Sequence, residues 1–403
     1  MSQGNASEMP SLLYSEDEEE LRAAVRALLD DRAGWPEVLA KTETDEPYDT
    51  ALWRRLAADV GCAGLLIPES QGGAGASYRE AAVVAEEVGR SVAPVPYLGS
   101  AVVATAALLE AADSALLKDL ASGTVTAALA VPFATGPFAT GPFADGPPAA
   151  WPSAKGPLTG MRVAAPQAGD PAGQTRLRGT VAGVADALPA DVLLVAADGV
   201  PPGLYAVNAG APGLTVTPVV SLDATRQLAD LTLDDVPARC VASGPVAVRS
   251  VQAALAAGAA MLAAEQLGMA QRCLDMTVAY LKERHQFARP VGSFQALKHR
   301  LADVWVAITQ ARSAARYAAA CLASGDPDAP VAVALAKASC SEVAVHAAQE
   351  CVQLHGGIGF TWEHPAHLYL KRAKSSSIGF GTPDWHRAAL ADLAGLPAAG
   401  RPR

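Results

Sequence analysis

The spacing of apolar residues changes near residue 124 and again near residue 245, and this order of patterns leaves few possible architectures. Before residue 124, apolar residues recur at helical spacing, as in the stripe from Leu21 to Leu29. Short β-branched runs follow, and an Ala-rich helical pattern returns from Pro245. We therefore predict an α+β fold: an N-terminal helical domain (1–123), a middle β-barrel or sandwich domain (124–244) and a C-terminal helical bundle (245–403).

The middle region contains several short strand candidates separated by glycine and proline. Their spacing favours a small antiparallel barrel or sandwich. The candidates are residues 124–131, 190–196, 203–207, 214–219 and 231–233. Residues 132–146 form three tandem pentapeptides, PFATG, PFATG and PFADG, which are too rich in proline and glycine to continue a strand. We interpret this repeat as a surface loop without chemistry.

The charge of the chain argues against nucleic acid as a partner. The chain has 31 Lys and Arg against 41 Asp and Glu, a net charge of −10, without a basic block that could follow a phosphate backbone. The run Glu16 to Glu20 is acidic, unlike the cationic start of a signal peptide. The apolar run Ala253 to Ala264 is shorter than the roughly 20 residues that span a bilayer. We expect a cytoplasmic protein without a membrane partner.

A metal site is not indicated by the cysteines or histidines. The six cysteines are scattered, with neither a C-x-x-C pair nor a zinc-type spacing with histidine. His355, His364 and His367 lie close in sequence, but with Glu363 they do not form H-E-x-x-H. We expect these histidines to serve packing or to lie at the edge of a cofactor.

The segment from Glu283 to Leu297 combines cations and an aromatic residue with a helix start. A long helix is predicted to run into Arg284 and Phe287, followed by a turn at 289–292 and a new helix with Ser293 as N-cap. A guanidinium pairs with pyrophosphate oxygens, an aromatic face covers a ring, and free N–H groups at a helix start favour anions. Such a segment suits a dinucleotide. Taken without the rest of the chain, however, it is better explained as a bend with an exposed arginine and a core phenylalanine.

The second informative segment is Gln353 to Thr361. Gly356, Gly357 and Gly359 lack the Cβ atoms that would keep a ligand away from the backbone. The segment is neither G-x-G-x-x-G after a strand nor a G-K-[ST] loop. A phosphate site and a tight turn between packed helices both remain open for this motif alone.

Together the two segments resemble the acyl-CoA dehydrogenase family. The chain carries R-x-x-F-x-x-P-[IV]-x-x-[FH]-Q and then Q-x-H-G-G-x-G-F, in the family's order and spacing. The resemblance implies a C-terminal four-helix bundle, an acyl-CoA substrate and an FAD whose flavin ring lies in the neighbouring subunit. It also implies that the ADP portion of this FAD is held by Arg284, Phe287, Gln295, Gln353, Gly356 and Gly357.

The family's catalytic glutamate is missing from both positions where family members carry it. That base removes the α proton of the thioester while the flavin accepts the β hydride. The first position aligns with Phe380, in the run Ile378 to Thr382, and the second falls at about Gly258. Glu265 lies two helical turns beyond Gly258, roughly 10 Å along the axis. For Glu265 and for Asp384 we favour a structural role, so no catalytic residue is assigned.

The middle region also departs from the family. Members carry a T-E-P-x-x-G-S-D loop that contacts flavin and substrate, and further on a W-[IV]-[ST]-N strand. Here those places hold the PFATG repeat and residues 179–186. The motifs that contact the flavin are therefore absent, whereas the motifs for the ADP portion are present.

This asymmetry resembles heterotetrameric acyl-CoA dehydrogenases of actinobacteria, several of which act on steroid side-chain thioesters. Our first hypothesis is a non-catalytic subunit that gives its ADP-binding half-site to a paralogous catalytic subunit. The second is a self-sufficient homo-oligomer that uses Glu265 or Asp384 as base. The third is a scaffold on this fold without a redox function. The acyl group and the partner are not specified by the sequence.

Overall fold

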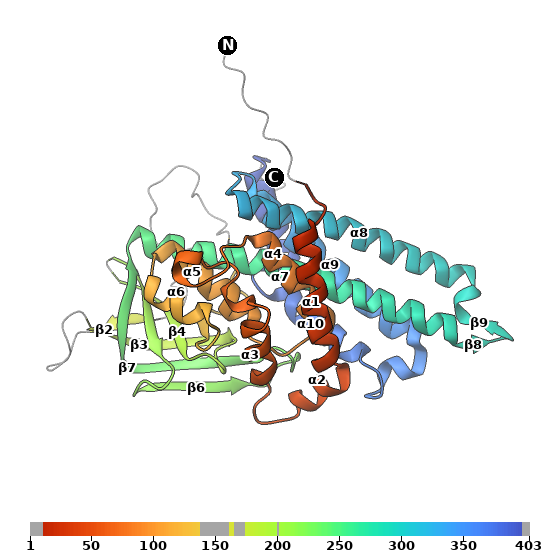
Figure 1. Ribbon diagram of the computed structural model, residues 1–403, viewed down its shortest axis with the longest axis horizontal. Helices are drawn as coiled ribbons and strands as arrows, with labels where there is room; N and C mark the ends of the chain where they lie inside the picture. The colour runs from red at the N-terminus through yellow and green to blue at the C-terminus, as the bar shows by residue number, and fades with distance from the viewer. Residues whose placement is uncertain (1–10, 138–160, 165–173, 200, 397–403) are drawn as a thin grey trace, which may run out of the picture.

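The computed structural model describes residues 11–137, 161–164, 174–199 and 201–396. Its helices and strands follow the predicted order, helical up to Ala121, strands from Ala127 to Ser243, and helical again from Pro245. Figure 1 shows the sheet at one end and the long helices at the other, with the first helices packed against both. The predicted α+β class is confirmed, whereas the domain limits at 123 and 244 stay predictions.

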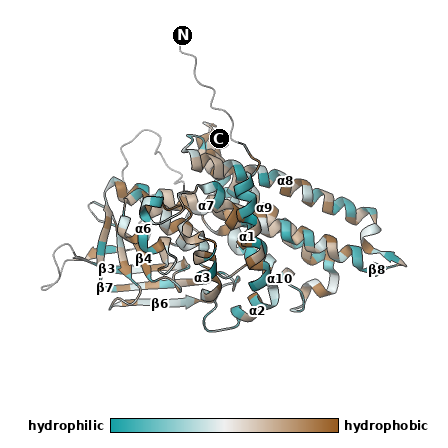
Figure 2. Cartoon of the chain, viewed as in Figure 1, coloured by the Kyte–Doolittle hydropathy of each residue, from teal (hydrophilic) through white to brown (hydrophobic). Residues whose placement is uncertain are grey.

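The N-terminal region is an assembly of short helices that pack on the long central helix of the C-terminal region. Ser15 and Glu18 form a capping box that starts the first helix, because each side chain accepts a backbone N–H of the other residue. Figure 2 shows that this helix is hydrophilic along much of its length. The helices are α1 (Glu16–Arg32), α2 (Trp35–Thr42), α3 (Thr50–Ala58), α4 (Tyr78–Ser91), the π-helix η3 (Tyr97–Ala104), α5 (Thr105–Ala111) and α6 (Ser114–Ala121), with 3₁₀ turns η1 (Cys62–Gly64) and η2 (Glu69–Gln71).

The described residues of the middle region form one curled seven-stranded sheet. Its order is β1-β4-β5-β7-β3-β2, and β6 also pairs with β7. Every pairing is antiparallel except that of β1 with β4. A bridge between Arg162 and Asp198 brings the β2 edge back to the end of β4. The strands are β1 (Ala127–Ala130), β2 (Arg162–Ala164), β3 (Gln174–Ala185), β4 (Val192–Ala197), β5 (Gly203–Asn208), β6 (Leu214–Val219) and β7 (Leu228–Ser243).

The five strand candidates overlap β1, β4, β5, β6 and β7, but the prediction missed β2 and β3 and made β7 much too short. β7 extends over 16 residues, far beyond 231–233, because it pairs with β3 on one side and with β5 and β6 on the other. β3 was not predicted, since two register shifts and Gly179 and Gly183 break its alternation. Of the stretch 179–186, all but Asp186 lies in β3. The PFATG repeat lies outside the described residues beyond Pro137.

The C-terminal region is a bundle around α7 (Pro245–Glu283), which crosses the molecule from the sheet to a hairpin at the far tip (Figure 1). Gly89 of α4 and Gly268 of α7 let these two helices cross closely. A Cβ on either glycine would collide with the backbone of the facing helix. The other elements are β8 (His285–Gln286), β9 (Arg289–Pro290), η4 (Val291–Ser293), α8 (Gln295–Ser324), α9 (Ala329–His355), η5 (Gly356–Phe360), α10 (Ala366–Ile378) and α11 (Pro383–Leu393).

Two helical stretches are long and apolar enough to cross a membrane by length and composition alone, residues 245–283 and 329–360. In their most apolar windows, 72% and 61% of the residues are buried inside the molecule. The bundle core accounts for this apolar character, because helices surrounded by other helices are apolar on most sides.

Candidate functional site

The tip of the bundle is a tight hairpin between α7 and α8. Phe287 and Ala288 connect β8 to β9 and both have positive φ, 53° and 57°, as in a type I′ turn. Phe287 is 87% exposed, and its ring lies edge-on to that of Phe294 at 6.1 Å. The guanidinium of Arg289 lies over the Phe294 ring at 3.9 Å. Aromatic and cationic groups are thus displayed to the outside.

Two details of the predicted segment were wrong. The chain reverses at Phe287 and Ala288 rather than at 289–292, because residues on both sides of that pair form the β8–β9 ladder. Ser293 is not the N-cap of α8. It lies in the 3₁₀ turn η4, and Phe294 takes the N-cap position without a side-chain hydrogen bond.

We expect Ala288→Gly to raise the free energy of unfolding by about 1 kcal/mol, because a side chain in the left-handed region costs about that much. The matched control is Ala302→Gly, at an exposed position within α8, which we expect to lower it by about 1 kcal/mol. Urea unfolding of both variants measures the difference. Equal destabilisation by the two substitutions would contradict the hairpin geometry.

The glycine turn follows directly on the end of α9, and its glycines serve different purposes. Gly356 has φ of 63°, which favours glycine. A Cβ on Gly356 or Gly357 would meet no atom within 4 Å, so the backbone there is open to an approaching group. A Cβ on Gly359 would lie 2.5 Å from the Val352 carbonyl oxygen, so this glycine is required by packing.

Contacts between helices bring the two segments to the same end of the bundle. The ring of His355, the last residue of α9, stacks on Tyr280 of α7 at 4.5 Å. Arg300 near the start of α8 forms two hydrogen bonds with Glu350 of α9, at 2.7 and 2.8 Å. The predicted ADP-binding residues are all exposed at this end, namely Arg284, Phe287, Gln295, Gln353, Gly356 and Gly357.

This exposed end can receive an anion. Among the described residues no carboxylate lies within 4.0 Å of the Arg284 guanidinium, so this charge is available for an ion pair. Arginine binds phosphate through paired, charge-assisted hydrogen bonds, and backbone without Cβ atoms allows close approach. An exposed guanidinium, an exposed phenyl ring and open glycines are groups that can bind an anionic ligand with a flat ring.

The two positions of the missing base meet in space and are filled by an aromatic ring. A Cβ on Gly258 of α7 would lie 2.7 Å from Cζ of Phe380, so the ring occupies the space a side chain there would need. Phe380 is buried and packs edge-on against Phe133 at 5.5 Å. Its N–H donates to the Phe133 carbonyl at 2.7 Å. We call Phe133, Phe380 and Gly258 the aromatic plug.

The remaining space beside the aromatic plug is small. Its volume is about 20 Å³, room for one water molecule. The walls come from η3, β1, the end of β3 and the plug itself, with Leu98, Val103, Leu129, Val131 and Asp186 among the lining residues. Among the described residues, the side chains thus leave little free volume beside the plug.

Glu265, one of the two alternative bases, is locked in a buried ion-pair network. Its oxygens accept from Arg226 at 2.6 Å and from Arg372 at 2.9 Å. Arg372 also donates to Thr225 at 2.9 Å, and its guanidinium lies 3.4 Å from Asp223. Burial raises the pKa of the Glu265 carboxyl, but the two guanidiniums outweigh burial and hold this pKa below its usual range. A base needs the opposite shift.

Asp384, the other alternative base, lies at the surface. Its side chain is 95% exposed and pairs with Arg387 one turn later in α11, at 3.1 Å. It therefore cannot exclude water or face a buried thioester. Its contacts are those of an ordinary helix-start carboxylate.

Asp186 is a buried carboxylate beside the plug that sequence reasoning did not single out. It accepts from the Tyr48 hydroxyl at 3.0 Å and from the Gly99 N–H at 2.9 Å, so both oxygens are occupied. Burial raises the pKa of the Asp186 carboxyl. Nothing in the sequence marks it, because its partners come from distant segments.

Lys337 of α9 is fully buried and holds the segment that carries the plug. Its ammonium donates to the Ser341 hydroxyl at 2.8 Å and to the carbonyls of Ser376 and Gly381 at 3.1 and 3.3 Å. The ring of His386 lies 2.8 Å from the Phe380 carbonyl oxygen on the same loop. The backbone on both sides of Phe380 is therefore fixed.

We expect the stability conferred by Lys337 to rise with pH. Burial lowers the pKa of the Lys337 ammonium to about 7, whereas an unfolded lysine has a pKa of about 10.4. Between these values the unfolded chain binds one proton more than the folded chain, so basic pH favours folding. Relative to Lys337→Met, the wild type should gain about 1 kcal/mol per pH unit between about pH 7.5 and 9.5 in urea unfolding. Parallel pH profiles would contradict this.

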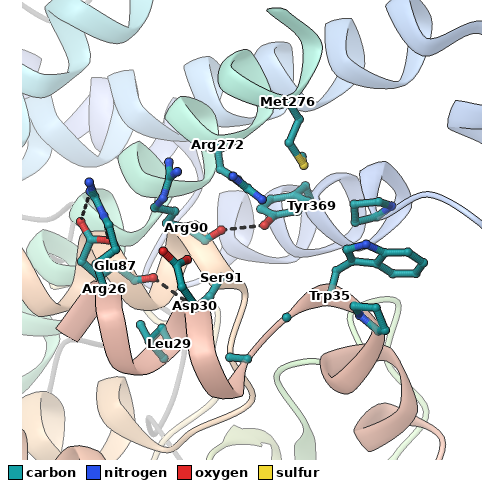
Figure 3. Close-up of a pocket in the computed structure, with 14 residues that line it drawn as sticks. Arg26, Leu29, Asp30, Trp35, Glu87, Arg90, Ser91, Arg272, Met276 and Tyr369 are labelled. Atoms are coloured by element: carbon teal, nitrogen blue, oxygen red, sulfur yellow. Dashed lines mark hydrogen bonds and ion pairs between the residues drawn. The ribbon is translucent and has the colours of Figure 1, made fainter. Parts of the chain in front are cut away.

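A separate pocket of about 170 Å³ lies between α1, α2, α4 and α7 (Figure 3). Its guanidiniums are largely engaged, because Arg26 pairs with Glu87 at 2.7 Å and Arg90 with Asp275 at 2.7 Å. An open groove of about 540 Å³ shares some of its walls, including Trp35, and reaches His355. Both hollows follow the junction between the N-terminal helices and the bundle.

Comparison with known proteins agrees with this geometry. Residues 15–124 match the acyl-CoA dehydrogenase N-terminal domain, and residues 248–394 match the acyl-CoA dehydrogenase C-terminal domain. Acyl-CoA dehydrogenase IpdE2 of Mycobacterium tuberculosis is 36% identical over 364 residues, which cover 90% of this chain and 92% of that protein.

Two solved structures of similar proteins cover nearly the whole fold. A variant of the Tcur3481-Tcur3483 steroid ACAD has a TM-score of 0.78 and 33% identity, over 94% of this chain and 98% of the matched chain. The ChsE4-ChsE5 complex from Mycobacterium tuberculosis has a TM-score of 0.80 and 28% identity, over 96% and 100%. The chain therefore belongs to the acyl-CoA dehydrogenase family, FAD-dependent oxidoreductases that act on acyl-CoA.

Proposed function

We propose that this chain is the non-catalytic subunit of a heteromeric, FAD-dependent acyl-CoA dehydrogenase. The observation that carries the proposal is the aromatic plug, in which Phe380 fills the place of the catalytic glutamate and the space beside Gly258. With this plug, neither position where family members carry the glutamate holds a carboxylate, and the cavity that the described residues leave beside it has a volume of about 20 Å³. The other end of the bundle exposes the Arg284 guanidinium, the Phe287 ring and the glycines of the turn after α9.

The ADP half-site is the part of the chain that fits FAD. Arg284 would pair with the pyrophosphate, Phe287 would cover a ring, and Gln295 and Gln353 would donate hydrogen bonds at the rim. Gly356 and Gly357 would let the nucleotide approach the backbone, because no Cβ stands in the way. When bound, FAD supplies the hydride acceptor for desaturation of the thioester.

The described residues on the flavin side of this chain support the assignment of the ring to a partner. The cavity beside the plug holds about one water, and the guanidinium of Arg226 lies over Phe133 at 5.5 Å within the same junction. We therefore assign the flavin ring, the base and the substrate to a paralogous partner that carries the glutamate and the T-E-P loop. This chain would donate its ADP half-site to that partner.

Two similar structures support the partner and the substrate class in this proposal. One is named as a complex of two differently named chains, ChsE4 and ChsE5, and the other as the Tcur3481-Tcur3483 steroid ACAD. By analogy we propose a heterotetramer that desaturates a steroid-derived acyl-CoA thioester in the cytoplasm. The acyl group is left open within that class.

The alternative is a self-sufficient homo-oligomer with an unusual base. The contacts of the two candidates go against it, since Glu265 is held by two buried guanidiniums and Asp384 is exposed. A scaffold without any role in FAD binding is the remaining option. Replacement of Arg284 by alanine tests this option.

Co-expression tests the proposed function. The chain is expressed alone and together with a paralogue that carries the glutamate and the T-E-P loop, first of all one encoded by a neighbouring reading frame. We expect a stable complex with one FAD per pair of chains and acyl-CoA dehydrogenase activity, whereas the chain alone should have neither. Activity of the lone chain with its own FAD would refute the proposal.

A further inference from the structure

His355 occupies an unusual position at the centre of the glycine-turn end of the bundle. The residue is 2% exposed and its ring contacts two other rings. Tyr280 of α7 stacks on it at 4.5 Å with 29° between the planes, and His364 lies at 4.0 Å with 38°. One side chain of α9 thus contacts α7 and the segment that leads into α10.

The orientation of the His355 ring is fixed by a hydrogen bond to its own helix. Nδ1 lies 2.6 Å from the Cys351 carbonyl oxygen, and because a carbonyl only accepts, Nδ1 carries the hydrogen and donates. Nε2 is buried and makes no hydrogen bond with the described residues. Two ring contacts and one hydrogen bond leave the imidazole little freedom.

The stack connects the two parts of the ADP half-site. Gly356 follows His355 directly, with φ of 63°, so the position of the turn depends on where that helix end is held. Tyr280 lies one helical turn before Arg284, about 6 Å along the axis of α7. A shift of His355 against Tyr280 would therefore move the open glycines relative to the guanidinium.

We propose that His355 is a positioning residue, which through Tyr280 and His364 keeps the glycine turn at a fixed place relative to Arg284. The inference rests on the proposed function only for its consequence, tight binding of FAD at the shared site. The mechanical part concerns this chain alone. A misplacement of about 1 Å at a binding group can reduce a function that depends on geometry by about 100-fold.

The first test uses the lone chain and three variants. His355→Ala removes the stack and the hydrogen bond, whereas His355→Phe keeps an aromatic ring that can contact Tyr280 and His364. Leu117→Ala, in the core of the N-terminal region, is the control for general loss of stability. The measurement is amide hydrogen exchange at residues 284–287 and 356–359.

We expect His355→Ala to speed exchange at both segments about 10-fold, because local opening no longer breaks the stack. His355→Phe should restore most of the protection. Leu117→Ala should not speed exchange at these two segments more than it does in the middle of α9. Wild-type exchange in His355→Ala, or the same pattern in Leu117→Ala, would overturn the inference whether or not the chain serves FAD.

The second test measures the FAD dissociation constant of the co-expressed complex after removal and titration of FAD. His355→Ala should raise it about 10-fold or more, with His355→Phe within about 3-fold of the wild type. An unchanged constant in His355→Ala would overturn the positioning role. A wild-type complex that binds no FAD would refute the proposed function, and the exchange data would then decide the inference alone.

Discussion

Replacement of Glu265 by glutamine is expected to lower the free energy of unfolding by about 3–5 kcal/mol. The carboxylate is buried between the guanidiniums of Arg226 and Arg372, and glutamine leaves both without their common counter-charge. Removal of one partner from a buried ion-pair network costs more than the pair itself contributes. Because the Glu265 pKa is lowered in the fold, this contribution is present above about pH 4.3, the unfolded value, and is lost as the pH falls through the folded pKa.

The matched control for Glu265→Gln is Glu350→Gln. Glu350 also accepts two hydrogen bonds, but both come from Arg300, whose side chain is 43% exposed. A pair of this kind contributes at most about 1 kcal/mol. Urea unfolding of both variants separates a structural Glu265 from a catalytic one. Near wild-type stability of Glu265→Gln, together with lost turnover, would identify Glu265 as the base and favour the self-sufficient enzyme.

Replacement of Arg284 by alanine is expected to weaken FAD binding by the heteromeric complex about 10- to 100-fold. A hydrogen bond to a charged group contributes about 1.5–3 kcal/mol, which corresponds to that range. The Arg284 guanidinium is exposed and forms no ion pair with the described residues. Loss of the guanidinium should therefore weaken cofactor binding and leave the stability of the fold unchanged. Titration of FAD into the cofactor-free complex gives the dissociation constant.

Arg249→Ala serves as the control for Arg284→Ala. Arg249 is also exposed, and it pairs with Glu110 at 2.6 Å near the opposite end of α7. We expect this variant to bind FAD as the wild type does. If the complex with Arg284→Ala also binds FAD with wild-type affinity, this chain does not bind the ADP portion. That result would support the scaffold interpretation.

Much of the fold could be predicted from local patterns. Helical periodicity located the N-terminal region and the bundle, and alternating runs located five strands, because both patterns repeat over several residues. β3 escaped because Gly179 and Gly183 interrupt it and its pairing shifts register twice. The long pairing of β7 depends on three neighbours, which local sequence does not specify.

The site could be predicted only in part, for a different reason. The motifs contain Arg284 and Gly356, and a family pattern is sufficient to find them. That Phe380 fills the space beside Gly258 is a contact between distant segments, visible only once α7 and the loop after α10 are in place. The same holds for the two arginines around Glu265, since Arg226 and Arg372 come from different regions of the chain.

The most direct test of the account is an FAD titration of the purified lone chain, followed by flavin fluorescence and by retention on ultrafiltration. Because the aromatic plug leaves room for about one water beside Phe380, we predict occupancy well below one FAD per chain. The same titration of the co-expressed pair should reach one FAD per two chains. Tight, stoichiometric binding by the lone chain would contradict the claim that its own flavin side is closed.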